Sequence, residues 1–121
     1  MCSIFTAIEP KDYAFQTRSV RLGGHATSVR LEAMFWSTLE EIACVQKVTL
    51  GRFLSMLNDE VLQADADEPH NFASLLRCAC LTYIAEVRGK PDALERLRIS
   101  AHADFGRRGA LPALRVASMR R

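Results

Sequence analysis

Two copies of the tetrapeptide Ser-Val-Arg-Leu, at residues 19–22 and 28–31, carry side chains whose types and spacing could bind a polar partner. In an extended strand alternate side chains face opposite sides, so each copy places serine and arginine on one face and valine and leucine on the other. Arginine presents a planar fork of donors, and a serine hydroxyl both donates and accepts. The repeat therefore predicts a sheet with one hydrogen-bonding face and one face that packs into a core.

The segment between the two copies predicts how they are arranged. Gly23-Gly24-His25 separates them, and glycines can supply the positive φ that a tight turn requires. The expected element is a hairpin that pairs residues 17–22 with residues 27–31. Ser3 to Ile8 is predicted to form a separate short strand that ends before Pro10.

Three amphipathic helices are expected after the hairpin, because the apolar spacing changes to a helical period. The first covers residues 32–46, the second follows Thr49 as its N-cap, and the third follows Asn71 as its N-cap. The third helix is expected to bury an apolar stripe made of Phe72, Leu75, Leu76, Ala79, Tyr83 and Ile84. A further short helix is expected over residues 92–100.

Composition indicates one domain, and the elements expected above give it an α+β, mainly α fold class. The chain has 121 residues, of which 49% are apolar and 25% charged. We expect a domain over residues 1–88 and a basic, partly helical tail over residues 89–121. No apolar run approaches the ~18 residues of a membrane-spanning helix, and the first residues lack the pattern of a secretory signal. A cytoplasmic protein is therefore expected.

Charge is segregated along the chain. Residues 1–31 hold four basic and two acidic side chains, residues 32–69 hold two basic and eight acidic, and residues 70–121 hold ten basic and four acidic. The formal net charge of +2 therefore combines two basic ends with an acidic middle. Such segregation permits a polyanion partner without proving one, and ordinary solvated charge is the more common explanation of such a pattern.

Other residue types that could do chemistry favour no enzyme or metal site. Cys78 and Cys80 lie two positions apart on a predicted helix, where they point in different directions and form no Cys-x-x-Cys chelate. The chain contains no glycine-rich phosphate loop, nucleophile elbow or His-Glu-x-x-His segment. We expect free thiols, no cofactor, no bound metal and no enzymatic activity.

The order of elements over residues 26–64 resembles the ribbon-helix-helix family of DNA-binding proteins. The matching segments are Thr27-Ser28-Val29-Arg30-Leu31-Glu32, Trp36 to Ala43, and Thr49-Leu50-Gly51-Arg52-Phe53. Residues 16–22 and 71–77 look like a bacterial subfamily of short proteins of this type. The resemblance implies an obligate homodimer that binds double-stranded DNA as a transcriptional regulator or repressor.

The resemblance also implies roles for particular residues. Arg30 would bond guanine O6 and N7 in the major groove, Ser28 would contact several bases, and Ala26 would read few. Phosphate would be bound by the backbone amides of Thr49 and Leu50 at a helix start and by basic side chains. These basic side chains are Lys47, Arg52, Arg18 and Arg21. The dimer core would comprise Val29, Leu31, Phe35, Leu39, Ile42, Phe53, Leu54 and Leu57.

The expected hairpin departs from the family pattern of one strand per chain. Two hairpins paired in a dimer would present four strands, about 14 Å of backbone, which is too wide for the ~12 Å major groove. Either the first strand folds aside, with Arg18 and Arg21 on flanking phosphates, or docking is unusual and these arginines are themselves readers. An alternative function is a protein-interaction module with no specific operator, in which the same dimer presents the surface of the third helix or the tail to a protein partner. Finding Ser28 and Arg30 buried against protein would favour this alternative.

Overall fold

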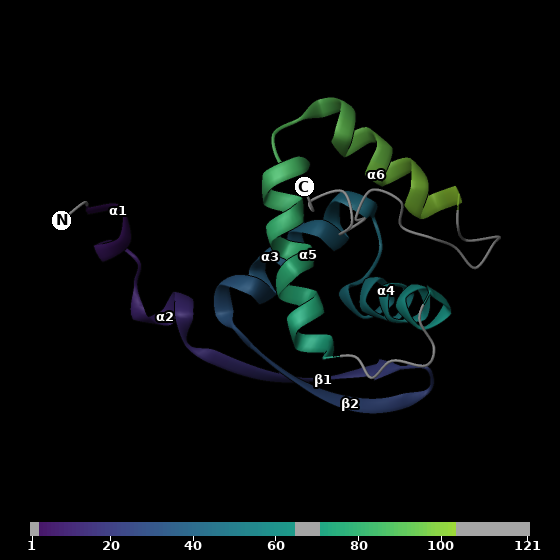
Figure 1. Cartoon of the computed structure of the whole chain (residues 1–121), viewed down its shortest axis with the longest axis horizontal. Coiled ribbons are helices and arrows are strands. Elements are labelled where there is room, and N and C mark those ends of the chain that lie inside the picture. Colours follow the sequence, from purple (N-terminus) through teal and green to yellow (C-terminus); the bar gives the residue numbers. More distant parts are fainter. Residues whose placement is uncertain (1–2, 65–70, 104–121) are drawn as a thin grey trace.

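The computed structural model describes residues 3–64 and 71–103 of the chain. It contains one two-stranded antiparallel sheet and six helices, of which the first two are single turns (Figure 1). In chain order the elements are α1 (Ser3–Thr6), α2 (Pro10–Tyr13), β1 (Phe15–Leu22), β2 (His25–Glu32), α3 (Ala33–Gln46), α4 (Leu50–Ala64), α5 (Phe72–Glu86) and α6 (Pro91–Ala103).

The predicted hairpin is confirmed and is longer than expected. β1 and β2 pair from Leu22 opposite His25 to Phe15 opposite Glu32. Gly23 and Gly24 form the two-residue turn with φ of 58° and 85°, values that side chains with a Cβ rarely adopt. A turn of this kind has the twist of the strands that it joins, which fixes the register of the whole hairpin.

The helix starts follow the sequence closely. Oγ1 of Thr49 accepts a hydrogen bond of 3.1 Å from the amide of Arg52, and Oδ1 of Asn71 accepts one of 3.1 Å from the amide of Ser74. Both predicted N-caps are therefore confirmed. Lys47 ends α3 in the left-handed conformation with φ of 59°, so the chain turns sharply before α4 begins.

A single apolar core joins the hairpin to the helices. α4 packs against β1, α3 and α5 pack against β2, and α3 contacts both α5 and α6. Val29 is 4% exposed and Leu31 is 0% exposed within one chain. These two residues of the expected dimer core are therefore already covered within one chain. β1, α4 and α5 supply in one molecule the cover that a lone strand would take from a partner.

The N-terminal segment differs from its prediction. Ser3–Thr6 is a helical turn rather than a strand, and the amide of Ala7 bonds the carbonyl of Ser3 at 3.0 Å. No described strand lies beside it, so local bonds satisfy the backbone groups that a sheet would otherwise bind. This segment projects away from the body of the molecule (Figure 1), with Ile4 and Phe5 exposed.

The C-terminal part of the fold also differs from its prediction. α6 is longer than the expected helix over residues 92–100, and it packs on α3 with Ala93, Leu97 and Ala101 buried. Residues 91–103 therefore belong to the domain rather than to a tail. In α5, Ile84 is 42% exposed, whereas Cys80 is buried in the core. Residues 104–121, the rest of the expected basic tail, lie outside the described residues.

Candidate nucleic-acid interface

The outward face of the hairpin carries three cross-strand pairs of small, polar or basic side chains. Directly opposite residues in an antiparallel pair point to the same side of the sheet. The register therefore places together the pairs Thr17 and Arg30, Ser19 and Ser28, and Arg21 and Ala26. All six residues are exposed. A fourth pair on this face, Phe15 and Glu32, lies at the open end of the hairpin, where Oε1 of Glu32 accepts a hydrogen bond of 3.0 Å from Nε of Arg77. The other three pairs hold no acidic residue, so this part of the face offers hydrogen-bond donors and positive charge.

Two arginines lie across this face, one on each strand. Nη1 of Arg21 donates a hydrogen bond of 2.9 Å to the carbonyl of Gly24. The guanidinium of Arg30 lies over the ring of Phe15, 4.2 Å from its centroid. Because a guanidinium has five donors, these contacts leave each arginine able to bond further acceptors. Both are therefore held along the strand in an accessible position.

Arg18 lies on the opposite face, in contrast to Arg21. It is paired with Val29, so it points toward the helices, where its Nη1 donates to Oε2 of Glu40 at 2.8 Å. Its guanidinium also lies 4.7 Å from the centroid of the Trp36 ring, and the Trp36 indole donates to the carbonyl of Gln16 at 2.9 Å. These contacts join β1 to α3. The structure thus supports a structural role for Arg18 rather than the expected phosphate contact.

The residues expected to bind phosphate near the second long helix lie at its exposed N-terminal end. Lys47, Thr49 and Arg52 are exposed, and Leu50 is half-buried as the first residue of α4. Thr49 acts as the cap, while the amides of the first turn have no partner inside the helix, as at any helix start. The positive end of the helix dipole lies here as well. The arrangement can accept an anion.

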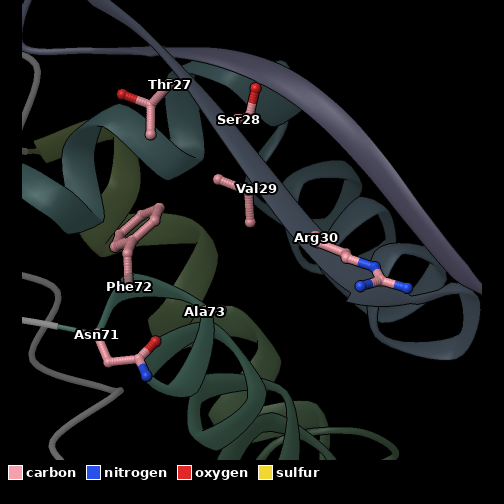
Figure 2. A pocket seen from close by; sticks show the side chains of 7 residues that line it. All are labelled: Thr27, Ser28, Val29, Arg30, Asn71, Phe72 and Ala73. Carbon is pink, nitrogen blue, oxygen red and sulfur yellow. The ribbon is translucent and has the colours of Figure 1, made fainter.

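A groove of about 670 Å³ runs beside the edge of β2 that β1 does not cover. Residues 27–30 form one wall and residues 71–73, at the start of α5, form the other (Figure 2). The side chains of Val29 and Phe72 point into the space between these walls, whereas Ser28 points away from it. Because Ser28 and Arg30 of the outward face also border this groove, the two surfaces adjoin each other along β2.

The residues expected to form a dimer core are mostly buried within the single chain. Seven of the eight are at most 5% exposed, and Phe35 is half-buried against the same cluster. The thiols differ in exposure: Cys80 is buried with Sγ 3.6 Å from the carbonyl oxygen of Phe35, while Cys44 and Cys78 are exposed. All three cysteines in the described residues are free.

Across residues 3–64 and 71–103, no three histidine, cysteine or acidic side chains come together as a possible metal site. None of the helices in this part of the chain is long and apolar enough to cross a membrane.

A strand whose outward face is polar and basic, followed by two helices with a capped turn between them, is the arrangement of the ribbon-helix-helix class, and β2, α3 and α4 follow it. The family model described as a ribbon-helix-helix domain matches residues 15–84, and the chain belongs to this family. Domains of this class are in general DNA-binding domains of transcription regulators.

A solved structure, that of an uncharacterized protein from Bordetella pertussis Tohama I, is similar to this chain. The two share 40% sequence identity with a TM-score of 0.66, over 83% of this chain and 75% of the other. No curated protein matches the chain.

Proposed function

We propose that this protein is a sequence-specific DNA-binding regulator of transcription, a repressor acting as a homodimer in the bacterial cytoplasm. The observation that carries the proposal is the exposed outward face of the hairpin, on which Ser28 and Arg30 point to solvent. Family membership and the similar bacterial protein support the class and the source.

The width of the hairpin supports entry into the major groove. Two strands lie about 4.8 Å apart, whereas the groove is about 12 Å wide. A four-stranded sheet made by pairing two hairpins would be about 14 Å wide. We therefore propose that each hairpin enters the groove separately. In that position Arg30 bonds guanine, Ser28 contacts a neighbouring base, and the start of α4 with Lys47 and Arg52 contacts phosphate.

Homodimerisation is a separate part of the proposal, since the core of one chain is already closed. Proteins of this class generally dimerise, and two copies would place two hairpins on successive parts of the duplex. Sedimentation of the purified full chain at micromolar concentration tests this part. We expect a dimer; a folded monomer at these concentrations would exclude it without affecting the DNA-binding proposal.

The experiment that tests DNA binding is selection from a library of randomised duplexes, followed by titration of the selected and a scrambled duplex at several salt concentrations. Arg30→Ala is expected to weaken binding to the selected duplex by about 5- to 140-fold and to relax the preference for one base pair. Arg96→Ala is the matched control, because Arg96 is an exposed arginine on α6, on the other side of the molecule from the hairpin (Figure 1). It should change affinity by less than about twofold.

Two results would contradict the proposal. One is that the wild-type chain enriches no sequence. The other is that Arg30→Ala weakens binding to the selected and scrambled duplexes equally, since a base contact must discriminate between them.

A further inference from the structure

The two strands of the hairpin are related by a local two-fold axis that passes between Ser19 and Ser28. These serines are directly opposite each other, and each begins a copy of Ser-Val-Arg-Leu. A rotation of 180° about this axis exchanges the strands and moves each residue of β1 onto the residue nine positions later. It therefore places Arg21 on Arg30. On the inner face it places Val20 on Val29 and Leu22 on Leu31.

The local contacts of the two arginines follow the same symmetry. Arg21 bonds the carbonyl of Gly24, and Arg30 lies over the ring of Phe15. Phe15 and Gly24 are themselves nine positions apart, so the two arginines contact equivalent positions, Phe15 at the start of β1 and Gly24 in the turn before β2, through contacts of different kinds. The symmetry thus extends from the repeated sequence to the placement of the side chains that would meet a partner.

We propose that one chain forms a complete, pseudo-symmetric reading ribbon, in which Arg21 of β1 is a specificity-determining residue equivalent to Arg30 of β2. This inference rests on the proposed function, and it assigns base contact to a strand that precedes the strand of the family pattern. B-DNA is itself two-fold symmetric in its backbone, so equivalent arginines meet equivalent positions on the two DNA strands. The preferred site of one hairpin is accordingly a short inverted repeat with a guanine on each strand.

The strand geometry gives the spacing of these guanines. Arg21 and Arg30 each lie two residues from the central serines, in opposite directions along the ribbon. At about 3.4 Å per residue they are separated by about 14 Å along the strands. Base pairs rise about 3.4 Å along the duplex, so the guanines should lie about four base pairs apart. Ser19 and Ser28 would lie over the base pairs between them.

The pseudo-symmetry also accounts for an outward-facing position of β2 that lacks a polar side chain. Ala26 offers only a methyl group, so β2 alone has no polar reader at that position. Arg21 lies directly opposite Ala26, and Arg30 lies opposite Thr17. The hairpin therefore offers one arginine at each end of its outward face. Neither arginine depends on a second chain.

The test compares the sequence preferences of four full-length proteins: wild type, Arg21→Ala, Arg30→Ala and the double variant. Each is selected on the same randomised duplex library, with Arg96→Ala as the control. For each hairpin that binds, wild type should enrich two guanines on opposite strands about four base pairs apart, so a bound dimer should enrich this pair twice. Because each ribbon can bind in either direction, both single variants should give the same motif with one guanine per hairpin, and the double variant should retain neither. Each single variant should bind the wild-type site about 5- to 140-fold more weakly.

The possible outcomes separate this inference from the proposed function. If Arg30→Ala alone abolishes both guanines while Arg21→Ala keeps them, two copies of β2 are the readers, and the inference fails although DNA binding stands. If Arg21→Ala weakens all sequences equally, Arg21 contacts phosphate and the inference also fails. If the wild type enriches no site, the proposed function fails.

Thermal unfolding of each variant is the control for folding. Each variant is expected to unfold at the temperature of the wild type because both arginines are exposed, which confirms that changed sequence preferences do not reflect misfolding.

Discussion

The hydroxyl of Tyr83 donates a hydrogen bond of 2.5 Å to Oε2 of Glu41, which joins α5 to α3. Arg88 binds the same carboxylate, with Nε 2.9 Å from Oε2 and Nη2 2.7 Å from Oε1. Burial, followed by the bond to Glu41, raises the pKa of Tyr83 to about 12, so the phenol keeps its proton at neutral pH. Tyr83, Glu41 and Arg88 form a cluster, called the Glu41 cluster below, that holds α5 against α3.

The Glu41 cluster predicts how stability depends on pH. The hydrogen bonds from Arg88 first, and also that from Tyr83, hold the pKa of Glu41 below its ordinary value of 4.5. A lowered folded-state pKa gives stability that is present above the ordinary value and is lost as the pH falls through the folded-state pKa. We expect the free energy of unfolding to fall below pH 4.5.

Urea denaturation between pH 7 and pH 3 measures this dependence. Glu41→Gln should weaken the pH dependence of the free energy of unfolding. Tyr83→Phe, which removes only the hydrogen bond from Tyr83 to Glu41, should give a pH dependence between those of the wild type and Glu41→Gln. At pH 7, Tyr83→Phe should cost about 1 kcal/mol. An unchanged pH dependence in Glu41→Gln would show that the cluster does not control acid stability.

The cysteines should differ in reactivity and in their effect on stability. Burial raises the pKa of Cys80 to about 12, and its side chain is fully enclosed, whereas Cys44 and Cys78 are exposed. A thiol reagent followed by peptide mass spectrometry should modify Cys44 and Cys78 in the folded protein and Cys80 only after unfolding. Cys80→Ser should cost about 1 to 3 kcal/mol, against less than about 0.5 kcal/mol for Cys78→Ser. Equal labelling of the three thiols would contradict the fold of α5.

The turn glycines should resist substitution for a conformational reason alone. A Cβ at Gly23 or Gly24 would meet no atom within 4 Å, yet both residues have positive φ. Gly23→Ala or Gly24→Ala should therefore destabilise the protein by about 1 to 2 kcal/mol. Gly51→Ala is the matched control: it also meets no atom but lies in α4 without positive φ. It should be neutral or stabilising by up to about 1 kcal/mol in chemical denaturation. The same sign at all three positions would argue against the turn.

The packing of α6 predicts a contrast between two of its residues. Leu97 is 0% exposed and belongs to the common core, while Ile99 is 57% exposed. Leu97→Ala should lower the free energy of unfolding by about 2 to 5 kcal/mol, because it leaves a cavity. Ile99→Ala should change it by less than about 0.5 kcal/mol. Similar small effects of both changes would mean that α6 adds no stability to the domain.

Some features of the candidate site could be predicted from sequence because they depend on neighbours in the chain. The glycine pair specifies a two-residue turn, and a strand period of two then places Ser28 and Arg30 on the side opposite Val29 and Leu31. Thr49 and Asn71 cap their helices through bonds that span three residues. Helical periodicity could not identify which side chains of α5 are buried, since Ile84 and Cys80 both lie near its apolar stripe. Contact with α3 buries Cys80, whereas Ile84 remains exposed.

Arg18 and Arg21 show which features the sequence determines by itself and which depend on the tertiary structure. The sequence alone determines that these two arginines lie three positions apart in a strand, and therefore on opposite faces. Only the tertiary structure decides that Glu40 and Trp36 bind Arg18, while Arg21 remains on the open face. In the same way the sequence determines that Val29 and Leu31 must be buried, but not whether another chain or β1, α4 and α5 cover them. Burial depends on which distant segments come together, and this information is absent from any local pattern.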